Sequence, residues 1–336
     1  MKRSNRAWVL VSRPKDHFEN DSIRMVELEV PDLANGEFLV KNIWLSFDPT
    51  QLIWMKRDSY VAKIELGEVV RSFSVGQIVE SKNERFKVGD FVTGLFGWQE
   101  YAVSDGSFVN LVKPIEFANP PWYSLSLFGI TGMSAYFGVK DIGRVKKGDN
   151  FLVSSAAGSV GSIAGQIAKI IGAKVIGIAG GEKKSKWVVE EAGFDYCIDY
   201  KKENISERLS ELFPDGIDVY FDNVGGEILD IVLSKIKQYG RIVLCGLISD
   251  YETGNFYPLR NYARLNSRSA RMEGFIVTDF ITRFEEAHDD LYNWLKENRL
   301  KQKEEITYGL ENAPEVFKKI FNGTSFGKQI LKIADV

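Results

Sequence analysis

The sequence predicts an α/β protein that combines a doubly wound parallel sheet with an antiparallel β-barrel domain. Apolar runs and helical patterns alternate from about residue 145 onward, which is typical of a parallel sheet with helices on both faces. The first third instead carries short strand-like runs separated by turn residues. A strand, a glycine-rich turn and a helix follow one another at residues 150–172, which indicates where the parallel sheet begins.

Length and composition fit a two-domain protein with a large core, since the chain has 336 residues of which 44% are hydrophobic. A net charge of −3 gives no support for a nucleic-acid or anionic-membrane partner. The basic N-terminus precedes too short an apolar run for a signal peptide, and no apolar segment is long enough to span a membrane. Cys197 and Cys245 lie in apolar strand-like contexts, so we expect buried free thiols and a cytoplasmic protein.

The residue inventory argues against a metal site. His17 and His288 are the only histidines, and neither they nor the cysteines have C-x-x-C or H-x-x-x-H spacing. A hydrolase is equally disfavoured, because Gly158-Ser159 lacks the flanks of a G-x-S-x-G nucleophile turn.

The barrel is predicted from strand-like runs separated by turns, such as the one at residues 34–37. Pro120-Pro121 marks a change in composition, and a helical segment over residues 124–137 follows it. The predicted strands of this part are residues 7–11, 25–30, 38–45, 65–73, 75–81, 91–96 and 99–103.

The glycine turn at residues 154–161 predicts a phosphate site. A buried strand at 151–153 leads into it, and a helix over 160–171 leaves it and stops at Gly172. The dinucleotide pattern G-x-G-x-x-G would need glycine at 156, where the chain has Ala156; Gly158 and Gly161 fill the other two positions. Backbone N–H groups and the helix dipole at such a turn attract phosphate. A glycine turn without a ligand is the alternative, but the strand at 174–179 completes a Rossmann-type strand–helix–strand unit.

The end of that second strand favours NADP over NAD. An NAD site needs an acidic residue there for the ribose 2′-hydroxyl, whereas this strand ends in Gly180-Gly181 and is followed by Lys183, Lys184 and Lys186. The glycines leave room for a 2′-phosphate and the lysines supply charge to bind it. Glu182 is the residue that would serve NAD, and a solvated helix start with surface lysines is the structural alternative.

The rest of the chain continues the alternation of strands and helices, and its last strand is expected to return to the first domain. A long amphipathic helix over 280–298 precedes a closing strand at 330–333, which we expect to pair within the first domain. The later strands are predicted at residues 196–198, 217–222, 241–247 and 271–277.

Sequence blocks spread over the chain resemble the zinc-independent branch of the medium-chain dehydrogenase/reductases, which contains NADPH-dependent 2-alkenal, curcumin and prostaglandin (leukotriene B4 12-hydroxydehydrogenase-like) reductases. The blocks are Asp48-Pro49, residues 66–71 (LGEVVR), 86–90 (FKVGD), 97–101 (GWQEY), 132–138 (GMSAYFG), 165–169 (GQIAK), 221–227 (FDNVGGE), 241–246 (RIVLCG) and 271–275 (RMEGF).

This resemblance implies a GroES-like substrate domain at residues 1–122 and 305–336, with a Rossmann NADP-binding domain at 123–304. It implies NADPH-dependent reduction of the α,β-double bond of enals or enones, without zinc, by a homodimer. An NADPH quinone oxidoreductase and a non-catalytic NADPH-binding sensor are the alternatives. RNA binding by the dinucleotide fold is disfavoured by the acidic charge.

The resemblance also implies the cofactor contacts. Lys184 and Tyr200 would bind the 2′-phosphate, with Lys183 or Lys186 as possible partners, and Asn223 would line the channel. For Asn223 the alternative is an Asx turn that caps residues 224–226, and for Tyr200 it is a surface tyrosine. The full set is Ser134, Ala157, Gly158, Val160, Gly161, Gly181, Lys184, Tyr200, Asn223, Cys245, Gly246, Phe275, Val277 and Ser325.

Catalysis needs a hydrogen-bond donor at the substrate carbonyl oxygen, which gains negative charge as hydride adds to the β-carbon. Tyr60, Tyr251 and Tyr262 are the candidate donors, and each is equally compatible with ordinary packing. Relatives have a tyrosine where this chain has Ser267, and an asparagine near the nicotinamide where it has Ser325. Relatives also carry Tyr-Met-Arg after the Asp-Pro pair, where this chain reads TQLIWM over residues 50–55, so the substrate mouth differs.

Overall fold

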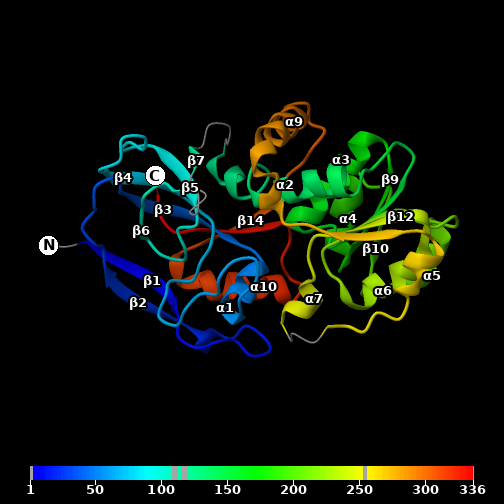
Figure 1. The fold of residues 1–336 in the computed structure, drawn as a ribbon, viewed down its shortest axis with the longest axis horizontal. Coiled ribbons are helices and arrows are strands. Elements are labelled where there is room, and N and C mark those ends of the chain that lie inside the picture. Colours follow the sequence, from blue (N-terminus) through cyan, green and yellow to red (C-terminus); the bar gives the residue numbers. More distant parts are fainter. Residues whose placement is uncertain (1–2, 108–112, 115–119, 253–255, 336) are drawn as a thin grey trace. The chain divides into compact units, whose positions relative to one another are not determined.

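The computed structural model describes residues 3–107, 113–114, 120–252 and 256–335. The chain divides into two compact units, shown in Figure 1. We name them the barrel unit (residues 1–126, 251–253 and 304–336) and the parallel-sheet unit (residues 127–250 and 254–303).

The barrel unit is built on a seven-stranded sheet in the order β14-β15-β3-β4-β5-β7, with β6 also paired to β3. Its strands are antiparallel except for the parallel pair β14 and β15. A separate antiparallel pair, β1 and β2, lies beside it. The bounds are β1 Ser4–Leu10, β2 Ile23–Glu29, β3 Phe38–Phe47, β4 Ser74–Ser81, β5 Phe91–Gly94, β6 Tyr101–Ser104, β7 Lys113–Pro114, β14 Glu304–Tyr308 and β15 Lys328–Lys332.

Two helices, α1 (Thr50–Lys56) and α10 (Ala313–Phe321), close the core of the barrel unit. Trp98 and Phe317 are fully buried there and meet edge to face, with ring centroids 5.4 Å apart. β15 pairs with β3 in antiparallel register, with Leu331 opposite Leu45, so the predicted return of the last strand to the first domain is confirmed. Short 3₁₀ turns lie at Asn20–Ser22, Pro121–Leu125 and Leu310–Asn312.

The parallel-sheet unit contains six strands in the order β10-β9-β8-β11-β12-β13, and all neighbouring pairs are parallel. Inward side chains of alternate strand residues, such as Leu152 and Ile176, pack against α5 and α6 on one face. α3 contacts β8 and β9 and packs on α2, so helices cover the other face as well. This is the predicted doubly wound α/β arrangement. The strands are β8 Asn150–Ser154, β9 Lys174–Ala179, β10 Tyr196–Asp199, β11 Ile217–Asp222, β12 Ile236–Leu244 and β13 Arg271–Gly274.

The helices of this unit begin and end close to the sequence signals where such signals exist. Gly172 ends α3 in the left-handed conformation at φ 100°, as its predicted stop requires. The α-helices are α2 Ile130–Phe137, α3 Ser159–Ile171, α4 Glu182–Glu190, α5 Ile205–Leu212, α6 Gly226–Lys235, α7 Ile248–Tyr251, α8 Ala263–Ser267 and α9 Phe284–Lys296, with a π-turn at Gly138–Ile142 and a 3₁₀ segment at Val277–Arg283.

The predicted strand at residues 65–73 is wrong. A tight turn interrupts it, because Glu68 N–H donates to the Glu65 carbonyl (3.1 Å) and Gly67 adopts φ 91°. Only a single bridge, Val69 to Val9, remains of the expected ladder. The predicted strands at 241–247 and 271–277 end early, at Leu244 and Gly274, and the helix predicted from residue 280 begins at Phe284 after a 3₁₀ segment.

Candidate functional site

The parallel sheet gathers most of the predicted cofactor residues at one edge. Parallel strands all end at the same edge, and in doubly wound sheets ligands bind outside those carboxyl ends. The segments that follow five of the strands therefore lie along this edge. They are the glycine turn after β8, Gly180-Gly181 after β9, Tyr200 after β10, Asn223 after β11 and Cys245 after β12.

The glycine turn has the tight backbone that the sequence predicts. A Cβ on Gly161 would lie 2.3 Å from the carbonyl oxygen of Ser155, so the helix can approach the turn this closely only with glycine. Ser155 itself is left-handed at φ 52°. Gly158 is the N-cap of α3, and no side chain caps this helix end. The first N–H groups of α3, which include those of Val160 and Gly161, are thus left for an outside acceptor.

The turn after β9 is shaped by a residue that sequence reasoning missed. Asp199, buried at the end of β10, accepts hydrogen bonds from Gly181 N–H (2.7 Å) and Lys201 N–H (3.1 Å). Tyr200 lies against Gly180, where a Cβ would come within 2.7 Å of the tyrosine ring. Gly181 adopts φ 96°, and nothing lies within 4 Å of the position its Cβ would take. Of the two glycines expected to leave open space, only Gly181 does so, because the Tyr200 ring fills the space at Gly180.

The three lysines after this turn differ in their surroundings. Lys184 is half-buried in the first turn of α4, and its N–H donates to the Gly181 carbonyl (3.1 Å). Lys186 is exposed and forms an ion pair with Glu190 (3.8 Å) one turn further along the helix. Lys183 is exposed. Lys184 and Tyr200 therefore flank the same Gly180-Gly181 turn, and the position of Lys184 differs from that of Lys186.

A buried polar hub joins β8 to β11. Asp222 Oδ1 accepts hydrogen bonds from Tyr220 Oη (2.7 Å), Ser154 Oγ (3.1 Å) and the N–H groups of Val224 and Gly225 (both 2.9 Å). Asn223 N–H donates to Ser154 Oγ (2.8 Å), and its Nδ2 donates to the Ser154 carbonyl (2.8 Å). The alternative in which Asn223 caps the 224–226 corner is wrong, because Asp222 caps it.

Burial raises the pKa of Asp222, and the hydrogen bonds from Gly225 and Val224 oppose that rise. Ser154 and Asp222 were missed in the sequence analysis. The sequence signal for both is a polar residue at the end of an otherwise apolar buried strand. Such a residue needs a hydrogen-bond partner, because helices on both faces of the sheet shield it from water.

The segments after β12 and β13 complete the edge. The N–H groups of Cys245 and Gly246 both donate to the Asp222 carbonyl, at 2.9 and 3.1 Å, which bends the chain out of β12. Burial, with Asp222 nearby, raises the pKa of Cys245 to about 12. Phe275 follows β13 and packs near Gly138, where a Cβ would lie 3.1 Å from its ring. Val277 and Ser134 are both buried in the same unit.

The candidate catalytic tyrosines are divided between the units. Tyr60 belongs to the barrel unit, is 51% exposed and follows α1. Partial desolvation raises the pKa of Tyr60, opposed by hydrogen bonding with Trp54 and Thr50. Tyr251 also falls in the barrel unit, where its carbonyl accepts a hydrogen bond from Lys56 Nζ (3.1 Å). Tyr262 lies in the parallel-sheet unit, 64% exposed at the start of α8.

Ser325 lies in the barrel unit, four residues beyond the end of α10 at Phe321. Its N–H donates to the Lys319 carbonyl (3.0 Å).

Two features are absent from the described part of the chain. None of its described helices is long and apolar enough to cross a membrane. Across the same residues, no three histidine, cysteine, aspartate or glutamate side chains gather into a metal-binding group.

Comparison with known proteins identifies the family. Residues 6–112 match the family model described as the N-terminal domain of oxidoreductase, and residues 159–293 match the one described as zinc-binding dehydrogenase. The chain belongs to the medium-chain dehydrogenase/reductase family, in the branch that contains curcumin, prostaglandin and 2-alkenal reductases.

Similar relatives match over almost the whole length. The chain is 36% identical to the NADPH-dependent curcumin reductase of Escherichia coli (strain K12), covering 99% of this chain and 98% of that one. It is 38% identical to prostaglandin reductase 1 of Rattus norvegicus, covering 97% and 98%. The crystal structure of CurA in complex with NADPH from Vibrio vulnificus superposes with a TM-score of 0.93 at 36% identity, covering 98% of this chain and all of that one.

Proposed function

We propose that the protein is an NADPH-dependent reductase of the α,β-double bond of enals and enones. The observation that carries the proposal is identity of 36% and more, over nearly the full chain, to relatives named as curcumin and prostaglandin reductases. The edge of the parallel sheet fits the cofactor, because the uncapped start of α3 and the close approach allowed by Gly161 suit a pyrophosphate.

Different residues would hold the pyrophosphate and the 2′-phosphate of NADPH. The N–H groups at Val160 and Gly161 would bind the pyrophosphate, and Lys184 with Tyr200 would bind the 2′-phosphate. Gly181 leaves room for that phosphate, since nothing lies within 4 Å of its missing Cβ. Asn223 is held by Ser154 through its Nδ2, and its Oδ1 has no hydrogen bond among the described residues, so it can accept one from the cofactor.

The cofactor supplies the hydride, and the protein must bind, orient and exclude water. A donor close to the substrate carbonyl oxygen stabilises the enolate-like charge and is worth about 3 kcal/mol. Tyr60 is compatible with this role, because its phenol, like that of an ordinary tyrosine, is protonated at neutral pH and burial raises its pKa further. Tyr251 and Tyr262 remain the other candidates. Replacing each of the three tyrosines in turn with phenylalanine would show which one supports turnover. Ser325, whose hydroxyl is smaller than an asparagine amide, would make one of the two hydrogen bonds of that amide.

The test is a substrate panel for the purified protein with NADPH and with NADH. We expect oxidation of NADPH with 2-alkenals, alkenones and curcumin-like dienones, and much slower turnover with quinones. Preferential turnover of quinones would replace the proposal by a quinone reductase. NADPH binding without turnover of any of these compounds would replace it by a sensor.

We also propose a homodimer located in the cytoplasm. β13 is the last strand of the parallel sheet, so its outer backbone groups have no neighbouring strand in that sheet and offer a self-complementary edge. Both cysteines are free, which fits a reducing compartment. Light scattering of the purified protein and fractionation of cells that express it test the two statements separately.

A further inference from the structure

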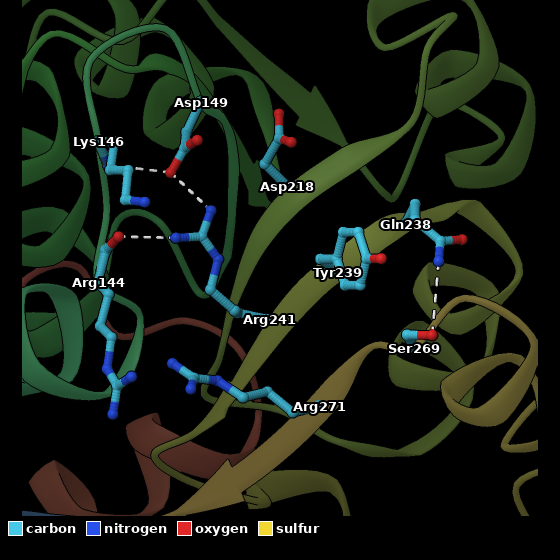
Figure 2. A pocket seen from close by; sticks show the side chains of 9 residues that line it. All are labelled: Arg144, Lys146, Asp149, Asp218, Gln238, Tyr239, Arg241, Ser269 and Arg271. Carbon is cyan, nitrogen blue, oxygen red and sulfur yellow. Dashed lines mark hydrogen bonds and ion pairs between the residues drawn. The ribbon is translucent and has the colours of Figure 1, made fainter.

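A second pocket lies at the opposite edge of the parallel sheet from the cofactor residues. It has a volume of about 480 Å³, and Figure 2 shows the side chains that line it. Asp149, Asp218 and Arg271 belong to the beginnings of β8, β11 and β13, and parallel strands all begin at one edge. The pocket is therefore separated from the Gly161 turn by the length of the strands.

The lining of this pocket is positively charged, in a chain whose net charge is −3. It contains Arg144, Lys146, Arg241 and Arg271 against Asp149 and Asp218. Both carboxylates are already neutralised. Asp149 pairs with Arg241 (2.8 Å) and accepts from Lys146 N–H (2.9 Å). Asp218 pairs with Lys237 (2.8 Å) and accepts from Asn150 N–H (2.8 Å).

Several donors in the pocket are left over. Arg144 donates through Nε to the Asp141 carbonyl (3.2 Å), but its terminal nitrogens have no partner among the described residues. The Lys146 ammonium likewise makes no hydrogen bond or ion pair in the described part of the chain. The Nε atoms of Arg241 and Arg271 are buried without a hydrogen-bond partner, although Glu273 approaches the latter at 3.8 Å. Guanidinium and ammonium groups in this arrangement suit an oxyanion with two charges.

The backbone around the pocket is also unusual. Arg144, Tyr239 and Ser269 line it, and each adopts a left-handed conformation, with φ of 46°, 62° and 45°. Such conformations are unfavourable for residues with side chains, so the surrounding structure must hold them. Tyr239 N–H donates to the Arg268 carbonyl (2.8 Å), and Gln238 Nε2 donates to Ser269 Oγ (3.4 Å). The Tyr239 ring is 72% exposed at the rim, across the pocket from Lys146 in Figure 2.

We propose that this pocket binds a small organic phosphate that carries an aromatic ring. The phosphate would bind Arg144 and Lys146, both exposed, whose charged ends lie well apart in Figure 2 and would turn toward a shared dianion. Their unused donors and two positive charges match a dianion better than a single carboxylate. The ring would stack on Tyr239. A pocket of about 480 Å³ is larger than an inorganic phosphate needs, which favours an organic ester. Because the pocket and the cofactor edge lie at opposite ends of the strands, the protein would bind the ligand and NADPH at the same time.

The experiment uses the protein saturated with NADPH, so that the cofactor site is filled, and AMP as the probe. Calorimetric titration should show one AMP per chain, bound more tightly than adenosine, inorganic phosphate or citrate. The double variant Arg144→Gln/Lys146→Gln should weaken AMP binding at least tenfold. Lys147→Gln, which removes the same charge from an exposed neighbour outside the lining, should leave it unchanged. Tyr239→Asn, which tolerates the left-handed backbone, should reduce AMP affinity toward that of inorganic phosphate.

Absence of saturable AMP binding to the NADPH-saturated protein would overturn the proposal. Equal weakening by Lys147→Gln and by the double variant would do the same, because it would show general charge attraction. Citrate binding as tight as AMP binding would overturn the assignment to a phosphate. None of these outcomes depends on the reductase activity, so failure here is distinguishable from failure of the proposed function.

Discussion

At the scale of single residues, we expect Lys184 to set the preference for NADPH over NADH. Lys184 is half-buried beside the Gly181 turn, whereas Lys186 is exposed and paired with Glu190 at 3.8 Å. A charge-assisted hydrogen bond contributes about 1.5–3 kcal/mol. One correctly placed lysine is therefore enough to separate NADPH from NADH by one to two orders of magnitude.

We expect Lys184→Ala to raise the Michaelis constant for NADPH at least tenfold and to leave that for NADH nearly unchanged, because only NADPH carries the 2′-phosphate. Steady-state kinetics with both cofactors measures the difference. Lys186→Ala is the matched control and should change neither constant more than twofold. Equal effects of Lys184→Ala on both cofactors would show that Lys184 does not bind the 2′-phosphate, and Lys183 would then be the candidate.

The cysteines provide a prediction that depends on pH. Burial raises the pKa of both Cys197 and Cys245 to about 12, and only the thiolate is nucleophilic. At pH 8 iodoacetamide should alkylate the folded protein about a thousandfold more slowly than the urea-unfolded chain, whose thiols have a pKa of about 8.5. Mass spectrometry of timed samples gives both rates.

The same raised pKa values fix the sign of the effect on stability. The folded state holds these protons more tightly, so their contribution is complete below the unfolded pKa of about 8.5 and is lost as pH rises toward 12. Cys197 is buried and Cys245 half-buried, and rapid labelling of the folded protein at pH 8 would contradict the raised pKa of these thiols.

At the scale of elements, the parallel sheet explains why the cofactor residues meet. Ser154 and Asp222 join the ends of β8 and β11 through a hydrogen bond of 3.1 Å. Asp199 fixes the turn after the neighbouring β9 through Gly181 N–H (2.7 Å). Each of these side chains is short and lies at the end of a strand, so the sheet register fixes the position of the turns that carry the candidate cofactor residues.

Gly161→Ala tests the junction between the glycine turn and α3. The new Cβ would lie 2.3 Å from the Ser155 carbonyl oxygen, a backbone atom that can move only with the turn. We expect a loss of about 2 kcal/mol in the free energy of unfolding, as for overpacked sites, and at least tenfold weaker NADPH binding. Urea unfolding and fluorescence titration measure the two quantities.

Gly274→Ala is the control for that variant, since its Cβ would meet nothing within 4 Å and its φ is not left-handed. It should change both quantities little. If Gly161→Ala bound NADPH as tightly as the unchanged protein, the turn would not be where the pyrophosphate lies.

An element could be predicted from the sequence where neighbouring residues alone determine its bounds. β9 and β11 were predicted at their observed bounds, because buried parallel strands read as continuous apolar runs. The strand expected at 65–73 failed, since the Glu65–Glu68 turn depends on Gly67 adopting φ 91°, which apolar spacing does not reveal. β12 stops at Leu244 because Asp222, more than twenty positions earlier, accepts from the next two N–H groups.

The site was predictable to the same degree. Local spacing indicated the glycine turn and the group of lysines after β9, and the family resemblance singled out Lys184, Tyr200 and Asn223 as candidates. A polar residue at the end of an apolar strand marks Ser154 and Asp222 as candidates, but local spacing does not show their partners or those of Asp199, because these hydrogen bonds join segments distant in sequence. The second pocket was missed for the same reason, since Arg144, Tyr239 and Arg271 meet only once the strand order is known.

At the scale of the whole molecule, histidine and cysteine, the usual ligands of structural zinc, are few, and both histidines are already engaged. His17 Nδ1 pairs with Glu252 (2.9 Å), and His288 Nε2 lies 3.0 Å from the Phe128 carbonyl, which it must donate to. Cys197 lies on β10 and Cys245 follows β12, with β9, β8 and β11 between them in the sheet, so the two thiols cannot bind one metal ion. These four are all the histidines and cysteines of the chain.

We therefore expect prolonged treatment with a strong zinc chelator to leave kcat/KM for an enone with NADPH within twofold of its initial value. The thermal midpoint should also be unchanged, because no structural metal would be removed. Metal analysis of the purified protein should give far less than one zinc per chain. Loss of activity that returns on addition of zinc, but not of magnesium, would show that carboxylates and backbone groups build a site which histidine and cysteine do not mark.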